Sequence, residues 1–483
     1  MRSLILLPLV MIAAPVAAQS AGTPTPVAFT NVTVVDVRSG ALRADQTVVT
    51  SGNRIAAMGP TASVLPPAGT TVVDARGKFL IPGLWDMHVH VTAPALASWA
   101  FPLFLANGIT GVRDLALNVD GLLQYRRNVA AGTVLGPRIL GSGVLIDGTP
   151  HVYPGITHVT TTPEAARQIV DSLSTRGVDF IKAYEMLRPE VFRAAAEQAR
   201  QRRIPIVGHL PLMVSAEEGV RAGMRSFEHL RNIDLACSSR ADSLRAVAAS
   251  MIAQGQREPG MRLRASIHAA LRPRALETYD EPRCMTLLAL FAEHGTWQTA
   301  NLVLGLQGAF RHDTTARIQQ WLRFVPDSMR RGWVRTSSTR APTPAQRAAR
   351  DSAMRRAEWT LRLVRNMRDR GVGLLAGTDF PNPVMVPGPT LHEELALFVR
   401  AGLTPAEALR TATLNPALFF GMADSLGTVE AGKLAELVLL EANPLEDIRN
   451  TSRISGVVRG GRYLDRAQLD GLLAALERSV SGR

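Results

Sequence analysis

The sequence predicts an α/β fold: a (β/α)8 TIM-type barrel with a small composite β-sandwich domain built from both ends of the chain. Through the middle of the 483 residues, eight short apolar runs alternate with amphipathic segments of helix length. Parallel strands need such crossover connections and are buried on both faces. Near both ends lie β-branched runs punctuated by Gly and Asn, which are typical of short antiparallel strands.

The first eighteen residues have the layout of a secretory signal. Arg2 precedes an apolar run from Leu4 to Ala14, and small residues at Val16 and Ala18 predict cleavage after Ala18. A retained membrane anchor is the alternative, but the run is shorter than the ~20 residues that a span needs. We therefore expect an exported protein, periplasmic or secreted, that is soluble after cleavage.

The domains follow from these patterns. We expect the composite β-sandwich over residues 26–83 and 424–465, and the barrel over 84–423 with helical insertions at about 238–290 and 305–360. The predicted barrel strands lie, in order, in "GLWDMHVHV", "GITGVRDL", "PRILGSGVL", "DFIKAYEM", "IPIVGHL", "MRSFEHL", "GTWQTANLV" and "VGLLAGTDF". Cys237 and Cys284 either form a disulfide or remain two buried thiols.

The net charge of +13 does not indicate a nucleic-acid partner. Residues 310–357 hold eleven Arg against three acidic residues, without aromatic interleaving or a recognisable binding motif. A solvated helical face explains this surplus better. We expect a small-molecule substrate and no nucleic acid, and the sequence leaves open whether the chain forms a homo-oligomer.

Five of the predicted strands carry potential metal ligands at or near their ends. They are His88 and His90, Lys182, His209, His229 and Asp379. The carboxyl ends of barrel strands meet at one face, so these side chains should converge although they are far apart in sequence. His88 and His90 are two residues apart and point to the same face of their strand.

Lys182 is one of three lysines in a chain that has 51 arginines. Its ammonium would point into a barrel lined by ligands for cations, and burial near metal favours the neutral amine. A neutral amine can add carbon dioxide to become a carbamate, an anionic ligand that arginine cannot provide. The alternative is a lysine paired with Glu185 or with a substrate carboxylate.

These residues resemble the metal-dependent amidohydrolase superfamily, in its imidazolonepropionase-related, prolidase-like branch with a binuclear metal centre. The resemblance rests on "PGLWDMHVH", "FIKAY", "VGHL", "FEHL", "GTDF" and the closing "GTVEAGKLAELVLLEANPLEDI". It implies two divalent ions, usually Zn²⁺, bridged by N6-carboxylated Lys182 and a hydroxide that attacks the carbonyl, while Asp379 shuttles the proton. Mononuclear deaminases of the superfamily have an H-x-x-E-like pattern, whereas "LPLMV" follows His209 here.

The function that this implies is hydrolysis of amide bonds, in dipeptides or in N-acyl amino acids with a free carboxylate. Cyclic amide or lactone hydrolysis with the same metals is the alternative, and a non-catalytic binding protein on a degenerate barrel is the alternative outside enzymes. Tyr184 is a candidate donor to the carbonyl oxygen, or a core tyrosine. His151 is a candidate catalytic residue and substrate contact, and His392 is a candidate substrate contact, or both are plain loop histidines. Arg113 and Asp114 predict a structural ion pair near the second strand rather than a catalytic dyad.

Overall fold

The two ends of the chain meet in one mixed sheet. The computed structural model describes residues 25–307, 319–334 and 344–481. The sheet has eight strands in the order β18-β17-β16-β5-β1-β2-β3, with β4 paired to β1. Their bounds are β1 Val27–Asp36, β2 Ala41–Ser51, β3 Arg54–Pro60, β4 Thr71–Asp74, β5 Phe79–Pro82, β16 Leu437–Leu440, β17 Ile454–Arg459 and β18 Arg462–Asp465.

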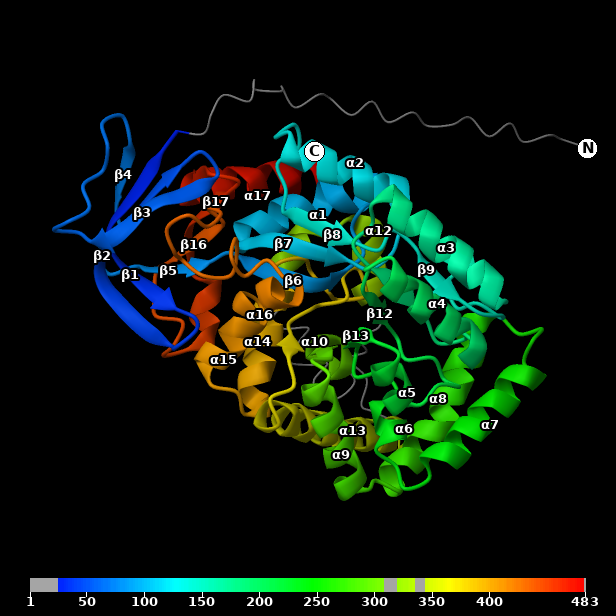
Figure 1. Cartoon of the computed structure of the whole chain (residues 1–483). Helices are drawn as coiled ribbons and strands as arrows, with labels where there is room; N and C mark the ends of the chain where they lie inside the picture. The colour runs from blue at the N-terminus through cyan, green and yellow to red at the C-terminus, as the bar shows by residue number, and fades with distance from the viewer. Residues whose placement is uncertain (1–24, 308–318, 335–343, 482–483) are drawn as a thin grey trace, which may run out of the picture.

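The seam between the two ends is the antiparallel pair β5 and β16. Leu80 of β5 lies opposite Leu439 of β16, and both side chains are buried. The rings of Tyr463 and Phe29 pack at an interplanar angle of 80°, with 5.3 Å between their centroids. Apolar burial therefore joins segments more than 350 residues apart, at the left of Figure 1.

The middle of the chain forms parallel strands separated by helices. One sheet has the order β6-β7-β8 and the other the order β10-β9-β11-β12-β13-β14-β15. Each of the eight predicted runs contains a strand, although the third covers β8 and reaches the start of β9. The bounds are β6 Leu84–Val89, β7 Ile109–Asp114, β8 Arg138–Gly141, β9 Leu145–Asp147, β10 Thr157–Val159, β11 Ile181–Ala183, β12 Ile206–Gly208, β13 Met224–Glu228, β14 Trp297–Thr299 and β15 Leu374–Leu375.

The predicted barrel does not appear as one continuous ladder, since the described strands form two sheets. A few backbone hydrogen bonds link the sheets at both edges. At one edge the Asp179 N–H donates to Gly141 O, at the end of β8, at 2.8 Å. At the other, the Met87 N–H of β6 donates to Ala376 O beyond β15 at 2.8 Å, and the Asp379 and His90 N–H groups donate to His88 O and Phe380 O at 2.7 Å. The chain turns at Gly143, where φ is +74°, and this turn separates β8 from β9.

Helices follow most of the parallel strands, and their ends obey ordinary capping rules. The Thr162 hydroxyl caps α3, which starts at Pro163 and ends before Gly177 in the left-handed conformation. The helices are α1 Pro94–Ala106, α2 Val119–Ala130, α3 Pro163–Arg176, α4 Pro189–Gln201, α5 Ala216–Arg221, α6 Ile233–Ala236, α10 Leu302–Gly305, α14 Pro389–Ala401, α15 Pro405–Thr411, α16 Leu414–Phe419, η2 Ile448–Ser452 and α17 Arg466–Val480.

Further helices occupy the regions expected to be insertions. Between β13 and β14 lie α7 Ala241–Gln254, α8 Gly260–Glu277 and α9 Glu281–Glu293, and between β14 and β15 lie η1 Gln319–Phe324, α12 Asp327–Val334 and α13 Pro344–Asp369. Helices α7 and α8 lie at the opposite end of the molecule from the mixed sheet (Figure 1). A disulfide joins Cys237 and Cys284, so these cysteines are not two free thiols.

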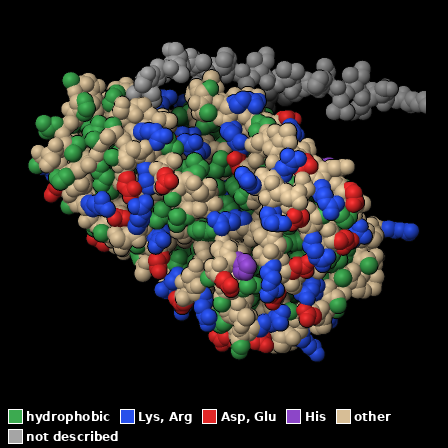
Figure 2. All heavy atoms as spheres, viewed as in Figure 1, with side chains coloured by type: hydrophobic (Ala, Val, Ile, Leu, Met, Phe, Trp, Pro, Cys, Tyr) green, Lys and Arg blue, Asp and Glu red, His purple; other side chains and the backbone are tan. Residues whose placement is uncertain are grey.

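Two sequence features lie wholly or partly outside the described residues. The predicted signal at residues 1–18 is one, and parts of the Arg-rich segment 310–357 are the other. Across the described ranges, no helix has the length and apolar character needed to cross a membrane. On the face shown in Figure 2, Lys and Arg side chains are interspersed with Asp and Glu.

Candidate active site

Asp379 lies among histidines that come from other strands. Its Oδ1 is 3.3 Å from His88 Nε2 and 3.2 Å from His90 Nε2, and its Oδ2 is 3.8 Å from His229 Nε2. His88 is in β6, His90 follows that strand, His229 directly follows β13, and Asp379 follows β15. The carboxyl ends of three strands thus bring these side chains together.

The second nitrogen of three rings fixes which tautomer is present. His88 Nδ1 lies 2.9 Å from Glu228 Oε2, and His209 Nδ1 lies 2.8 Å from Glu185 Oε1. His90 Nδ1 lies 2.6 Å from the Ala116 carbonyl oxygen. Carboxylate and carbonyl oxygens only accept, so each Nδ1 donates, and in a neutral ring Nε2 then keeps its lone pair.

The cluster therefore brings acceptors toward acceptors. Burial holds the pKa of His88 and of His229 well below the usual range, which favours neutral rings. The neutral His88 Nε2 and Asp379 Oδ1, 3.3 Å apart, repel one another unless a cation lies between them. His229 Nδ1 is buried without a hydrogen-bond partner in the described part of the chain. This donor set fits a divalent metal ion, and His88, His229 and Asp379 offer ligand atoms within 4.8 Å of one another.

Lys182 lies beside this cluster in the middle of β11. Its Nζ donates to the Leu115 carbonyl oxygen at 3.0 Å and lies 3.4 Å from His88 Nε2. The side chain is buried, and burial lowers the pKa of Lys182 to about 8. Its amine is thus closer to neutrality than that of an exposed lysine, as carbamate formation requires.

A buried ion pair holds Glu228, the carboxylate that accepts from His88. Arg113 Nη2 donates to both oxygens of Glu228 at 2.8 Å, and the Ser226 hydroxyl donates to Glu228 Oε1 at 2.6 Å. Our expectation that Arg113 pairs with Asp114 is therefore wrong. Adjacent strand residues point to opposite faces, and Asp114 instead accepts the N–H groups of Val91 and Thr92.

A second buried carboxylate, Glu185, supports His209. Its Oε2 accepts from His268 Nε2 at 2.6 Å, while Arg231 and Arg264 lie 3.7 and 3.6 Å from its Oε1. Burial alone would raise the pKa of Glu185, but His268, His209 and Arg231 outweigh burial and hold it well below the usual range. Glu185 therefore does not pair with Lys182, which was one alternative for that lysine.

Tyr184 is next to the metal-ligand candidates. Its ring stacks on His209 with 4.1 Å between centroids, and its hydroxyl accepts from Arg264 Nη1 at 2.7 Å. Burial raises the pKa of Tyr184 well above the usual range, so the hydroxyl keeps a proton to donate. His151 lies in the loop after β9, where Tyr153 packs on Tyr184 at 5.7 Å between ring centroids. This loop is therefore close to Tyr184.

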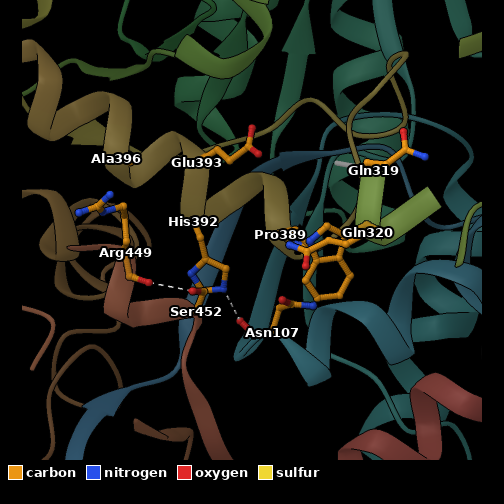
Figure 3. Close-up of a pocket in the computed structure, with 10 residues that line it drawn as sticks. Asn107, Gln319, Gln320, Pro389, His392, Glu393, Ala396, Arg449 and Ser452 are labelled. Carbon is orange, nitrogen blue, oxygen red and sulfur yellow. Dashed lines mark hydrogen bonds between the residues drawn. The ribbon is translucent and has the colours of Figure 1, made fainter. Parts of the chain in front are cut away.

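The structure does not bring His392 to the histidine cluster. His392 Nδ1 lies 2.9 Å from Thr451 Oγ1, and Nε2 lies 3.1 Å from Asn107 O. The ring lines a separate cavity of about 820 Å³ between α14, η1 and η2 (Figure 3). As a correction, His392 is a helix residue that ties α14 to η2 and α1, since its partners occupy both ring nitrogens.

Sequence reasoning missed most of the supporting groups. Glu228 directly precedes His229 in "FEHL", and a carboxylate in the last position of an apolar strand was a usable signal. His268 and Arg264 are on α8 and gave no such signal, because nothing in the helix pattern indicates what it packs against. Backbone strain was also invisible: His229 and Asp379 have φ values of 60° and 61°, which non-glycine residues rarely adopt.

A cluster of histidines and an aspartate at strand ends, beside a buried lysine, is typical of a metal site on an α/β fold. The chain matches the Amidohydrolase family over residues 79–303 and 313–464, and it belongs to that family. It is therefore a member of the metal-dependent amidohydrolase superfamily, whose members include hydrolases that act on C–N bonds.

Comparison with individual proteins supports the same assignment. The chain is 25% identical over 430 residues to the imidazolonepropionase of Symbiobacterium thermophilum, covering 83% of this chain and 87% of that protein. Adenine deaminases match over only 9% to 16% of their own length.

Two solved structures share the fold. A bottromycin amidohydrolase has a TM-score of 0.73 and 24% identity, covering 95% of this chain and 91% of that one. A putative prolidase from Bifidobacterium longum has a TM-score of 0.64 and 25% identity, covering 94% and 100%. These neighbours give the chain a TIM-barrel-like α/β fold.

Proposed function

We propose that the chain hydrolyses amide bonds in dipeptides or N-acyl amino acids that carry a free carboxylate. The observation that carries this proposal is the approach of Asp379 Oδ1 to His88 Nε2 and His90 Nε2 at 3.3 and 3.2 Å. Asp379 takes a proton from the water that adds to the carbonyl carbon. It then delivers that proton to the departing nitrogen as the C–N bond breaks.

We also propose that the same cluster binds two divalent metal ions, and that these ions are Zn²⁺. His88, His90 and Asp379 would hold one ion, His209 and His229 the other, and N6-carboxylated Lys182 would bridge them. When bound, such ions lower the pKa of water and polarise a carbonyl oxygen. The low pKa of Lys182, about 8, supports the carbamate because only a neutral amine adds carbon dioxide.

Arginines beside the cluster support a substrate with a free carboxylate. Arg264 reaches Tyr184, which stacks on His209, and Arg231 Nε is buried with no hydrogen-bond partner in the described part of the chain. A guanidinium binds a carboxylate through paired N–H donors. The proposed substrate would place its carboxylate near these groups and its scissile carbonyl toward Asp379.

The test combines metal analysis with a paired substrate library. Protein purified from zinc- and bicarbonate-supplemented cells is assayed for bound metal by elemental analysis. Its hydrolysis of dipeptides and N-acyl amino acids is then measured, and each substrate is paired with the corresponding carboxamide. We expect two equivalents of zinc and release of free amino acids from the carboxylates only. If the protein purified from these cells contains no metal and hydrolyses none of the library, the proposal is contradicted.

Cyclic amide or lactone hydrolysis is the second candidate. It is favoured by the match to an imidazolonepropionase over 83% of this chain. Dihydropyrimidines, hydantoins and lactones belong in the same library, and their hydrolysis without dipeptide cleavage would select this alternative.

The domain limits and the location of the protein are also proposals. We propose a composite β-sandwich at 26–83 and 424–465, a barrel at 84–423, and export directed by residues 1–18. The pairing of β5 with β16 supports a domain built from both ends. N-terminal sequencing of the protein from cell fractions tests cleavage after Ala18.

A further inference from the structure

One histidine on an insertion helix reaches the metal-ligand cluster through a carboxylate. His268 is in α8, and its Nε2 lies 2.6 Å from Glu185 Oε2. The other oxygen, Oε1, lies 2.8 Å from His209 Nδ1. Glu185 is completely buried. Solvent therefore does not compete with its hydrogen bonds to these two histidines.

The two carboxylate oxygens of Glu185 accept from different histidines. Oε1 accepts from His209 and leaves His209 Nε2 available as a ligand. Oε2 accepts from His268, which fixes the plane of the carboxylate. Arg231 and Arg264 lie 3.7 and 3.6 Å from Oε1, too far for hydrogen bonds, so they balance charge but do not set the orientation.

The histidine on the other side of the cluster is supported differently. His88 donates to Glu228, which is held by Arg113 and Ser226, and these three residues all come from the parallel strands. Glu185 is instead held by a helix outside those strands. The segment that carries this helix is closed by the disulfide between Cys237 and Cys284.

We propose that His268 is a positioning residue that orients His209 through Glu185. The insertion at α8 then stabilises the half of the metal site that contains His209, while the half that contains His88 is held by the strands. The inference rests on the proposed metal-dependent function, and it deepens that function by assigning a role to one residue of the insertion.

The test compares His268→Ala with His268→Gln. The Gln amide can still donate to Glu185, whereas Ala cannot. We expect His268→Ala to bind one of two ions roughly 10- to 100-fold more weakly in a chelator competition. His268→Gln should restore most of that affinity. His294→Ala, at an exposed histidine after α9, is the matched control and should bind both ions like the wild type.

A second measurement does not depend on metal. In ¹⁵N-histidine-labelled apoprotein, His209 of the wild type and of His268→Gln should show a protonated Nδ1. In His268→Ala the His209 signals should shift toward a mixture of tautomers. If His268→Ala fails to fold, His268→Asn replaces it, because its shorter amide does not reach Glu185.

The outcomes separate the two proposals. A wild type that binds no metal contradicts the proposed function, and the His209 signals then still decide whether His268 orients that ring. A wild type with two ions, together with a folded His268→Ala that binds both with unchanged affinity and leaves His209 unaltered, would overturn the positioning role.

Discussion

Asp379 Oδ1 lies 3.2 Å from His90 Nε2, although 289 positions separate the two residues in the chain. The same oxygen lies 3.3 Å from His88 Nε2, whose neutral ring donates from Nδ1 to Glu228 and offers only a lone pair there. The approach of Asp379 to His88 therefore requires positive charge between them. The predictions below follow from this requirement and from the groups around it.

Replacement of Lys182 by Arg should remove metal and turnover. Arginine keeps a positive charge and cannot form a carbamate, so we expect fewer than two bound ions. The rate should fall more than roughly 100-fold, beyond the loss typical of residues that support a ligand. Elemental analysis and kcat measure this. Lys78→Arg, at a partly exposed lysine paired with Glu441, is the control and should be active.

Asp379→Asn should stop turnover while substrate still binds. The amide cannot accept the proton, and we expect a loss of kcat on the order of 10²- to 10⁴-fold. Calorimetric titration with a slowly cleaved substrate checks binding, and Asp424→Asn at an exposed site serves for comparison. An unaltered kcat in Asp379→Asn would show that this carboxylate moves no proton.

Arg264→Met should weaken the binding of only those substrates that have a free carboxylate. We expect KM to rise roughly 10- to 100-fold for N-acyl amino acids, as for a charged hydrogen bond worth about 1.5–3 kcal/mol. KM for the matching carboxamides should stay as in the wild type. Arg262→Met changes an exposed residue of the same helix and should leave both values unchanged. Equal losses for both substrate sets would rule out carboxylate recognition by Arg264.

Glu394 should make stability depend on pH. This buried residue of α14 accepts the N–H groups of Leu302 and Val303, and burial raises its pKa from 4.5 to about 8. Between these values the folded state keeps a proton that the unfolded state has lost. The free energy of unfolding therefore falls as pH rises through this window, by up to about 1.4 kcal/mol per pH unit.

Urea unfolding of Glu394→Gln between about pH 5 and about pH 8 checks this dependence. The Gln variant has no such titration, so its stability relative to the wild type should improve as the pH rises. Glu358→Gln, at an exposed position of α13, should follow the wild type at every pH. Parallel curves for wild type and Glu394→Gln would contradict the prediction.

The sequence predicts the strands and the convergence of side chains better than the supporting groups. Period-two spacing places His88 and His90 on one face, and strand ends place His229 near Asp379, because these are properties of local backbone geometry. Glu185, His268 and Arg264 depend on how α8 packs, which is a tertiary property. His392 shows the converse error: its position after the last parallel strand suggested the site, but α14 directs its ring to η2.

The segment closed by Cys237 and Cys284 begins and ends at nearly the same point, since the two Cα atoms lie 4.4 Å apart across 47 positions. Such a segment can be lengthened or shortened without moving β13 or β14. We expect natural variation of the enzyme to concentrate in its parts that do not contact Glu185 or Tyr184, so that new substrates are acquired there while His268 and the reaction are inherited unchanged.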